Sequence, residues 1–343
     1  MLVICISMIA SFALVGCKAD SAAITAAAET TAATTAAAEV VASDKIKIRF
    51  LLCGSQGDTF ATVVFNGAET AGKLFGVDLE LVWGDGWAAE PYIQQFREAV
   101  STPGIQGISF TGSHGEDPAS PIVEIAKKNG IEIEWWNNDA PNLRKKFGGG
   151  FIGAIAEDMG RDLAEYTIKK YGFKEGDRAI VLAPFADTPT SAIREEASSQ
   201  AFEAAGMIVN RVSISPETFS SPELLTPIVT ASFLANPETK VILLPGGQSL
   251  GSASLYMEAL NKKPGEVIVI GFDLSKQVIN NFRAGYVQVA ADQQPYLQGF
   301  LPVQSLYQTI KYGFAPLYVN TGSGLVTEDN WETVAEYAEL GIR

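Results

Sequence analysis

Histidine, cysteine and clustered basic side chains are scarce in this sequence, and their scarcity excludes several kinds of site. The 343 residues include one histidine, His114, and three cysteines, Cys5, Cys17 and Cys53. Structural zinc sites are built from clusters of cysteine and histidine, and the spacing of an EF-hand calcium loop is also missing. We therefore expect no metal ion and no other cofactor.

A catalytic nucleophile also has little support. A hydrolase needs a nucleophile beside a base, and the single His114 is more typical of a loop residue than of a base. Cys53 ends the mostly apolar run 48–53, which favours a buried strand thiol over a reactive one. Paired carboxylates for glycoside hydrolysis are not excluded by spacing alone. We expect no enzyme and assign no catalytic residue.

The charge balance argues against nucleic acid as a partner. The formal net charge is −14, and no run rich in lysine or arginine occurs. Binding to a phosphate backbone requires clustered basic side chains that displace its counterions. With 47% hydrophobic and 19% charged residues the chain is typical of a globular protein. Its length exceeds what one hydrophobic core usually organises, so two lobes are expected.

The N-terminus has the pattern of an exported protein. Residues 1–16 carry no charge and are almost wholly apolar, which is short for a membrane span and suitable for a signal-peptide core. The run 14–17 resembles the bacterial lipoprotein cleavage box, so Cys17 is the predicted lipid anchor of an extracytoplasmic protein, on the cell surface or in the periplasm. An uncleaved anchor is the alternative, and no basic residue precedes the apolar run.

Residues 17–44 are expected to form a tether, because 18–44 are nearly all Ala, Thr, Ser and Glu without a periodic apolar face. A long solvated helix is the alternative. Either structure would space the folded body from the membrane.

From Lys45 onward, short apolar runs alternate with amphipathic segments, which predicts an α/β fold with parallel sheets covered by helices. Strands are expected at 46–52, 79–83, 107–110, 131–136, 179–182, 240–244, 267–272 and 286–291. Helices are expected around 60–75, 89–101, 119–129, 157–171, 191–205, 221–235, 248–261, 274–284 and 295–311. In such sheets ligands bind beyond the carboxyl ends of the strands.

The residues that follow the predicted strands are polar or aromatic, and none is a lysine or an arginine. Hydroxyl groups of a sugar or polyol both donate and accept hydrogen bonds, so amides and carboxylates suit them, while their C–H faces stack on rings. An anionic ligand would instead need basic residues here. The residues at these ends are Asp58, Phe60, Thr111, Trp136, Asn137, Asp139, Asp273 and Gln293.

Several of these residues also have a structural interpretation. Asp58 or Thr59 would cap the first helix, and Asp273 would cap the helix that starts near Leu274. Trp135 and Trp136 alternate along one strand, so at least one of them belongs to the core, and Phe60 fits packing equally well.

Four segments in this order resemble the ribose-type (type I) periplasmic binding proteins of sugar ABC importers. They are 47–60, Trp136–Pro141, Gly271–Asp273 and Asp292–Gly299. The similarity covers essentially all of 45–343, and the Asn-Asn-Asp-Ala-Pro and Gln-Gln-Pro-Tyr runs are fairly specific in combination. The resemblance implies two doubly wound parallel-sheet lobes joined by a three-strand hinge, with crossings near 153, 293 and 322.

The resemblance also implies roles for individual positions. Phe60 matches the first of two adjacent aromatic residues that sandwich the sugar, but Ala61 stands at the second position. Asn137 matches a clamp for two sugar hydroxyls, and Phe219 falls where the second lobe supplies a stacking ring. Asp58 and Thr111 occupy polar positions, and Asp273 and Gln293 match the carboxylate and amide that complete the contacts.

Other positions depart from the family pattern. Ser198 stands where an arginine is common, Ile155 and Ala156 replace a polar pair, and 245–247 replace an asparagine. The second lobe is therefore expected to be less polar than in ribose binders. A deoxy sugar, a small polyol or a furanone signal would suit it better than ribose.

The resemblance predicts a monomeric solute-binding protein that delivers a small neutral hydroxylated ligand to an ABC permease. Its lobes would comprise 45–153 with 294–322 and 154–293 with 323–343. A ligand-sensing subunit that reports to a membrane receptor is the main alternative. A dinucleotide-binding oxidoreductase is disfavoured because the Gly-x-Gly-x-x-Gly spacing at 148–153 precedes an apolar run instead of following a strand. A repressor would need a basic DNA-binding segment at the N-terminus.

Overall fold

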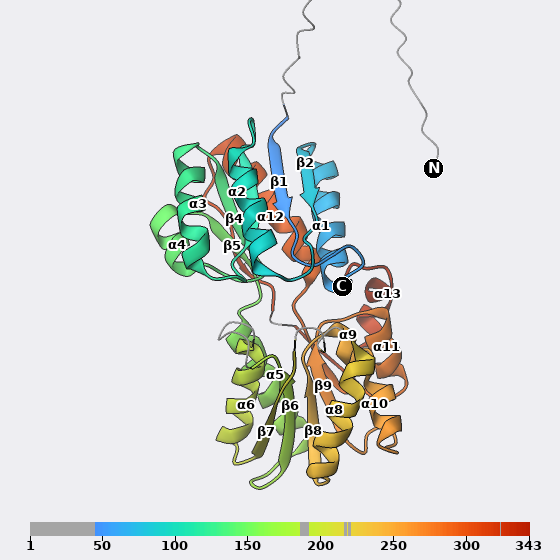
Figure 1. Cartoon of the computed structure of the whole chain (residues 1–343). Coiled ribbons are helices and arrows are strands. Elements are labelled where there is room, and N and C mark those ends of the chain that lie inside the picture. Colours follow the sequence, from blue (N-terminus) through green and yellow to red (C-terminus); the bar gives the residue numbers. More distant parts are fainter. Residues whose placement is uncertain (1–44, 186–191, 216–217, 219–220, 323) are drawn as a thin grey trace, which may run out of the picture. The chain divides into compact units, whose positions relative to one another are not determined.

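The computed structural model describes residues 45–185, 192–215, 218, 221–322 and 324–343. Cys17, the predicted signal peptide and tether, and Phe219 lie outside the described residues. The body from residue 45 contains two six-stranded sheets, as the α/β interpretation predicts (Figure 1).

The first lobe is built on a sheet with the strand order β11-β5-β4-β3-β1-β2, in which all pairs are parallel. Figure 1 shows α12 on one side of this sheet and α2 and α3 on the other. The strands are β1 (Lys47–Leu51), β2 (Asp78–Val82), β3 (Gly107–Thr111), β4 (Glu132–Trp136), β5 (Gly150–Gly153) and β11 (Tyr318–Asn320). The helices are α1 (Thr59–Phe75), α2 (Ala89–Ser101), α3 (Glu116–Lys128), α4 (Pro141–Phe147) and α12 (Pro295–Tyr312).

The second lobe has the strand order β12-β10-β9-β8-β6-β7, with β12 antiparallel to β10 and the other pairs parallel. Its strands are β6 (Arg178–Ala183), β7 (Ile208–Ser213), β8 (Thr239–Leu244), β9 (Ile268–Phe272), β10 (Val289–Asp292) and β12 (Gly324–Thr327). Its helices are α5 (Ala156–Tyr171), α6 (Ile193–Ala204), α8 (Pro222–Ala235), α9 (Gly247–Leu250), α10 (Ala253–Ala259), α11 (Lys276–Arg283) and α13 (Glu332–Glu339).

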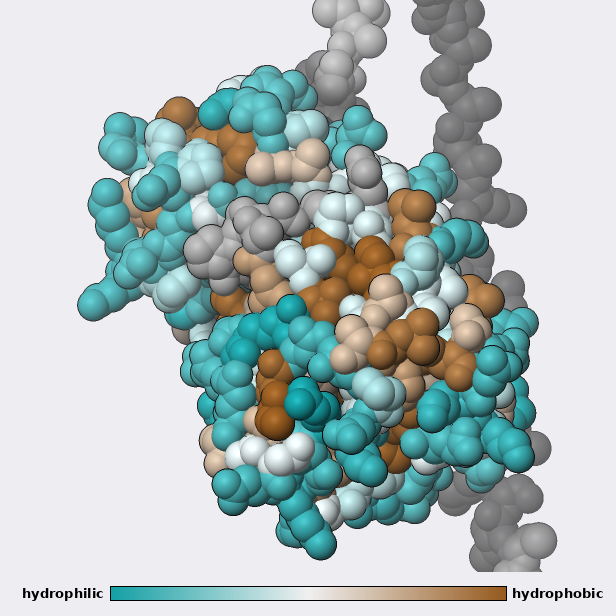
Figure 2. All heavy atoms as spheres, turned by 60° about the horizontal axis from the view of Figure 1, so that its bottom comes forward, coloured by the Kyte–Doolittle hydropathy of each residue, from teal (hydrophilic) through white to brown (hydrophobic). Residues whose placement is uncertain are grey.

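Burial follows from the position of each strand in its sheet. All five residues of β3 are buried, because β3 lies between β1 and β4 and is covered on both faces. The edge strand β7 has no buried residue. On the face in Figure 2, hydrophilic residues predominate along the edges and apolar residues gather near the middle. No helix within the described residues is long and apolar enough to cross a membrane.

The chain changes sheet three times, between β5 and β6, after β10, and between β11 and β12. Gly148 and Gly149 have positive φ angles and precede β5, so the glycine run forms a turn into a strand. At the third change, a Cβ atom on Gly322 would lie 2.6 Å from the Cβ atom of Ala154. The crossing segments are therefore packed against one another.

The sequence interpretation missed the shortest and most polar elements. The expected strands did not include β5, β7, β11 and β12, and the expected helices did not include α4 and α13. The strand expected at 286–291 lies at Val289–Asp292. The helix expected at 248–261 is divided into α9 and α10. In β7, Arg211 forms ion pairs with Glu196 and Glu203 of α6, so polar side chains obscure the strand pattern.

Candidate functional site

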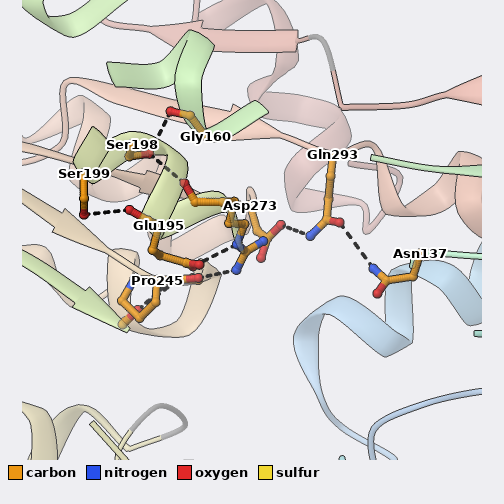
Figure 3. A network of polar contacts seen from close by, with 11 residues as sticks. Asn137, Gly160, Glu195, Ser198, Ser199, Pro245, Asp273 and Gln293 are labelled. Atoms are coloured by element: carbon orange, nitrogen blue, oxygen red, sulfur yellow. Dashed lines mark hydrogen bonds and ion pairs between the residues drawn. The ribbon is translucent and has the colours of Figure 1, made fainter. Parts of the chain in front are cut away.

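Three predicted site residues meet in one chain of side-chain hydrogen bonds (Figure 3). Asn137, directly after β4 of the first lobe, donates from Nδ2 to Gln293 Oε1 at 3.4 Å. Gln293, between β10 and α12, donates from Nε2 to Asp273 Oδ1 at 2.5 Å. Asp273 directly follows β9 of the second lobe. The strand ends of both lobes are thus connected through one amide.

Gln293 is held firmly in this position. Its side chain is buried, and its backbone carbonyl accepts a hydrogen bond of 2.9 Å from Gln298 Nε2. Gln298 Oε1 also accepts a 3.2 Å bond from Asn137 Nδ2. Gln298 of α12 therefore holds Gln293, whose side chain joins the two lobes, as expected for a residue beside a hinge.

Asp273 does not serve as a helix cap. Ser275 caps α11 by accepting a hydrogen bond from the backbone N–H of Val278 at 3.2 Å. The prediction that Asp273 caps this helix is therefore wrong, and its carboxylate instead accepts the hydrogen bond from Gln293. Burial raises the pKa of this carboxyl group, while the charge of Arg194 and the hydrogen bond from Gln293 oppose the rise.

Arg194 is a site residue that the sequence did not reveal. It lies in the first turn of α6, and its guanidinium carbon is 4.2 Å from the ring centre of Phe272, the last residue of β9. Its Nε donates to Glu195 Oε1 at 2.9 Å, and its Nη2 donates to the carbonyl oxygen of Pro245. None of the residues that directly follow the strands is basic, but a helix brings this one guanidinium group beside the ends of β8 and β9.

The position of Arg194 explains why it was missed. The resemblance places an arginine at position 198, where this chain has a serine that donates a hydrogen bond to the carbonyl oxygen of Arg194 at 3.0 Å. Arg194 is four residues earlier on the same face of α6. The positive charge of Arg194 is offset by the nearby carboxyl groups of Glu195 and Asp273. The site as a whole is therefore not cationic.

Aromatic rings line the neighbouring end of the first lobe. Phe60, at the start of α1, is half-buried and stacks on Trp136 with ring centres 6.4 Å apart. Trp136 itself is fully buried and donates from Nε1 to the carbonyl oxygen of Leu51 at 3.1 Å. Trp135 is buried as well. Trp136 therefore supports Phe60 from the core, and its burial does not favour the predicted direct contact with a ligand.

The other predicted polar residues already have partners in the protein. Asp139 accepts hydrogen bonds of 3.0 and 2.8 Å from Nε and Nη2 of Arg144. The buried Thr111 hydroxyl lies 2.8 Å from Ser113 Oγ. Asp58 Oδ1 caps α1 by accepting from the backbone N–H of Ala61 at 2.8 Å. A ligand would have to compete with these contacts, and the roles of the three residues in binding remain predictions.

A family model described as a periplasmic binding protein domain matches residues 49–313. The chain belongs to this family. Among curated proteins, the xylose/arabinose-binding protein XylF of Sulfolobus acidocaldarius is 32% identical over 111 residues. That match covers 30% of this binding protein and 27% of XylF, so it spans only about a quarter of the relative's length.

Solved structures with the same fold cover nearly the whole body. A carbohydrate transporter of Acidothermus cellulolyticus, solved with myo-inositol, has a TM-score of 0.72 at 20% identity, with 87% of this chain and 100% of that chain covered. GanP, a glucose-galactose binding protein from Geobacillus stearothermophilus, has a TM-score of 0.69 at 18% identity, covering 84% and 99%. At these identities the likeness shows the fold: two parallel-sheet α/β lobes of the type I periplasmic binding proteins.

A cavity of about 260 Å³ in this binding protein lies beside the polar chain. It includes Asp139 and Ser113 but neither Asn137 nor Asp273. Its second-lobe lining includes Ile193 and also Ile155 and Ala156, which replace a polar pair of the family pattern. The lining residues are Gly112, Ser113, Asn138, Asp139, Phe151, Ala154, Ile155, Ala156, Glu157, Ile193 and Tyr318.

Two features that resemble catalytic groups have structural roles in this binding protein. Cys53 is buried, as predicted, its Sγ lies 3.4 Å from His114 Nε2, and burial raises the pKa of the thiol to about 12. Residues 247–251 have the Gly-x-Ser-x-Gly spacing of a hydrolase elbow after β8, which the sequence interpretation overlooked. Ser249 is buried, however, and its Oγ donates to the carbonyl oxygen of Gly246 at 2.9 Å.

Within the described residues, no group of three or more His, Cys, Asp or Glu side chains is arranged to hold a metal ion.

Proposed function

We propose that this periplasmic binding protein captures a small, neutral, hydroxyl-bearing ligand between its lobes and delivers it to an ABC permease. The observation that carries the proposal is the chain Asn137–Gln293–Asp273, which connects the strand ends of both sheets. Amide and carboxyl groups there offer both donors and acceptors, as hydroxyl groups require.

The charges at the site support a neutral ligand. Arg194 is paired with Glu195 at 2.9 Å and faces the additional carboxyl group of Asp273. An anionic ligand would meet two carboxyl groups for one guanidinium group, whereas sugar hydroxyls bond to either charge. The ligands named for the relatives, xylose or arabinose, myo-inositol, and glucose or galactose, favour a monosaccharide, a deoxy sugar or a cyclic polyol.

Binding is tested by thermal-shift measurements on the mature body with monosaccharides, deoxy sugars and polyols. We expect at least one of these ligands to raise the melting temperature. Asp273→Asn should remove most of that rise, since it replaces the acceptor carboxylate while tolerating the left-handed backbone at φ 70.

The matched pair for the first lobe is Asn137→Ala and Asn261→Ala. Both asparagines have positive φ angles, 63 and 54, so alanine strains the backbone similarly at each position. Only Asn137→Ala should lose the ligand-induced rise. An equal loss in both variants, or no response of the wild type to any sugar or polyol, would contradict the proposal.

The membrane side of the proposal rests on the N-terminal sequence and on the family. Cys17 is proposed as an acylated residue that anchors the protein outside the cytoplasm, next to its permease. Cys17→Ala should move the protein from the membrane fraction to the soluble fraction. Purification of the full chain with a transporter permease, as opposed to a sensor kinase, would separate import from the sensing alternative. The lobe limits predicted from the sequence remain a proposal, which the strand membership of the two sheets supports.

A further inference from the structure

We propose that Trp87 supplies the second stacking ring of the binding site and selects ligands in ring form. The inference rests on the proposed function and adds that the same site prefers ring-shaped ligands. Ala61 stands where the family resemblance expects that second ring. Ala61 is fully buried and carries no ring, so a second ring would have to come from another element.

Trp87 reaches the site from a different element. It lies in the loop between β2 and α2, at the carboxyl end of β2. The backbone N–H of Gly54 donates to the carbonyl oxygen of Gly86 at 3.0 Å, which fixes this loop beside the one that leads into α1. Trp87 therefore lies at the same sheet edge as the predicted ligand contacts.

The ring of Trp87 is exposed but held in place. The residue is 42% exposed, whereas Trp135 and Trp136 are at most 1% exposed. Its Nε1 donates to Asp58 Oδ2 at 3.2 Å, while Asp58 Oδ1 caps α1. Both oxygens of Asp58 thus have partners inside the protein, and Oδ2 positions the ring of Trp87.

Trp87 continues a row of rings that leads to the polar chain. The ring centres of Trp87 and Phe60 are 6.1 Å apart with an angle of 41° between the planes, and Phe60 stacks on Trp136. Asn137 directly follows Trp136. Rings bind the C–H face of a cyclic sugar, whereas a flexible open-chain polyol presents no such flat face. The row therefore favours pyranose, furanose or inositol rings.

The test compares Trp87→Ala, Trp87→Phe and the control Trp331→Phe by calorimetric titration. Trp331 stacks under Arg283 in the second lobe, with the guanidinium carbon 5.4 Å from its ring, and is not part of the row. The probes are D-xylose, L-arabinose and myo-inositol as rings, and xylitol and sorbitol as open chains. We expect Trp87→Ala to weaken ring binding by about tenfold, and Trp87→Phe and Trp331→Phe by less than about threefold.

Tryptophan fluorescence provides an independent readout. Ligand binding should change the emission of the wild type and of Trp331→Phe, and the change should be largely absent in Trp87→Phe. Unchanged ring affinity in Trp87→Ala, or preferred binding of open-chain polyols by the wild type, would overturn the inference while leaving the proposed function intact. No binding of any probe or other sugar by the wild type would instead overturn the proposed function. Melting temperatures without ligand show whether Trp87→Ala folds. If it does not fold, the fluorescence of Trp87→Phe on ligand addition tests the inference instead.

Discussion

Asn137 and Asp273 share a backbone feature that places their side chains. Both follow the last residue of a buried strand with φ angles of 63 and 70, in the left-handed region. Asparagine and aspartate tolerate this region better than other non-glycine residues. Gln294, next to Gln293, has a φ of 55. Backbone strain is thus concentrated around the hydrogen-bonded chain, as is common where side chains are positioned for function.

A second buried carboxyl group affects the pH dependence of stability. Glu134 of β4 is buried, its Oε2 accepts a 2.6 Å hydrogen bond from Ser305 of α12, and burial raises its pKa to about 8. The folded protein therefore keeps this proton over a pH range in which the unfolded chain releases it. The stability contributed by the group is complete below 4.5, the ordinary pKa of a glutamate, and is lost as the pH rises toward about 8.

The substitution Glu134→Gln should make the free energy of unfolding less dependent on pH in this range. From pH 5 to pH 8 the wild type should lose up to about 4 kcal/mol of unfolding free energy through Glu134, at about 1.4 kcal/mol per pH unit. The variant keeps an acceptor for Ser305 but has no proton to lose. Denaturant unfolding at pH 5, 6.5 and 8 measures the difference, and parallel profiles for both proteins would exclude a protonated Glu134.

The packing of α1 on α12 depends on two glycines. A Cβ atom on Gly67 of α1 would lie 2.0 Å from the carbonyl oxygen of Tyr296, and one on Gly299 of α12 would lie 1.9 Å from that of Val64. Neither backbone can accept a side chain without moving. The two helices, far apart in sequence, therefore approach as closely as only glycine permits.

Gly299→Ala should consequently destabilise the fold by about 1–3 kcal/mol or more, because the helices must separate. Gly76→Ala is the control, because its Cβ position has open space and only the strain of a positive φ of 65 is added. That strain amounts to about 1–2 kcal/mol. Chemical unfolding of both variants shows which substitution lowers the free energy of unfolding more. A smaller loss in Gly299→Ala than in Gly76→Ala would show that the close approach is not required.

At the scale of the whole molecule, the ligand is expected to couple the lobes. The ligand contacts both lobes only when the lobes are closed, so ligand binding favours the closed conformation. At a ligand concentration 100-fold above Kd the folded state should gain about 2.7 kcal/mol. A variant with tenfold weaker binding should gain only about 1.4 kcal/mol at the same concentration.

Ligand titrations followed by unfolding measure this gain, and hydrogen exchange locates it. Amide protection should rise in β4 of the first lobe and in β9 of the second. Protection confined to one lobe would show that the ligand does not bridge them.

The sequence alone determined the two-lobed α/β fold, because long periodic helices and buried strands depend on local patterns. It also predicted that Asn137, Asp273 and Gln293 lie together just after strands, and the structure joins them by hydrogen bonds between the strand ends of the two sheets. Tertiary structure decided the rest. Arg194 lies at a helix start that no strand pattern marks, Trp87 lies several residues beyond the end of a predicted strand, and the buried state of Trp136 depends on neighbours distant in sequence. Side-chain partners of this kind are set by packing between elements, which periodicity along the chain does not encode.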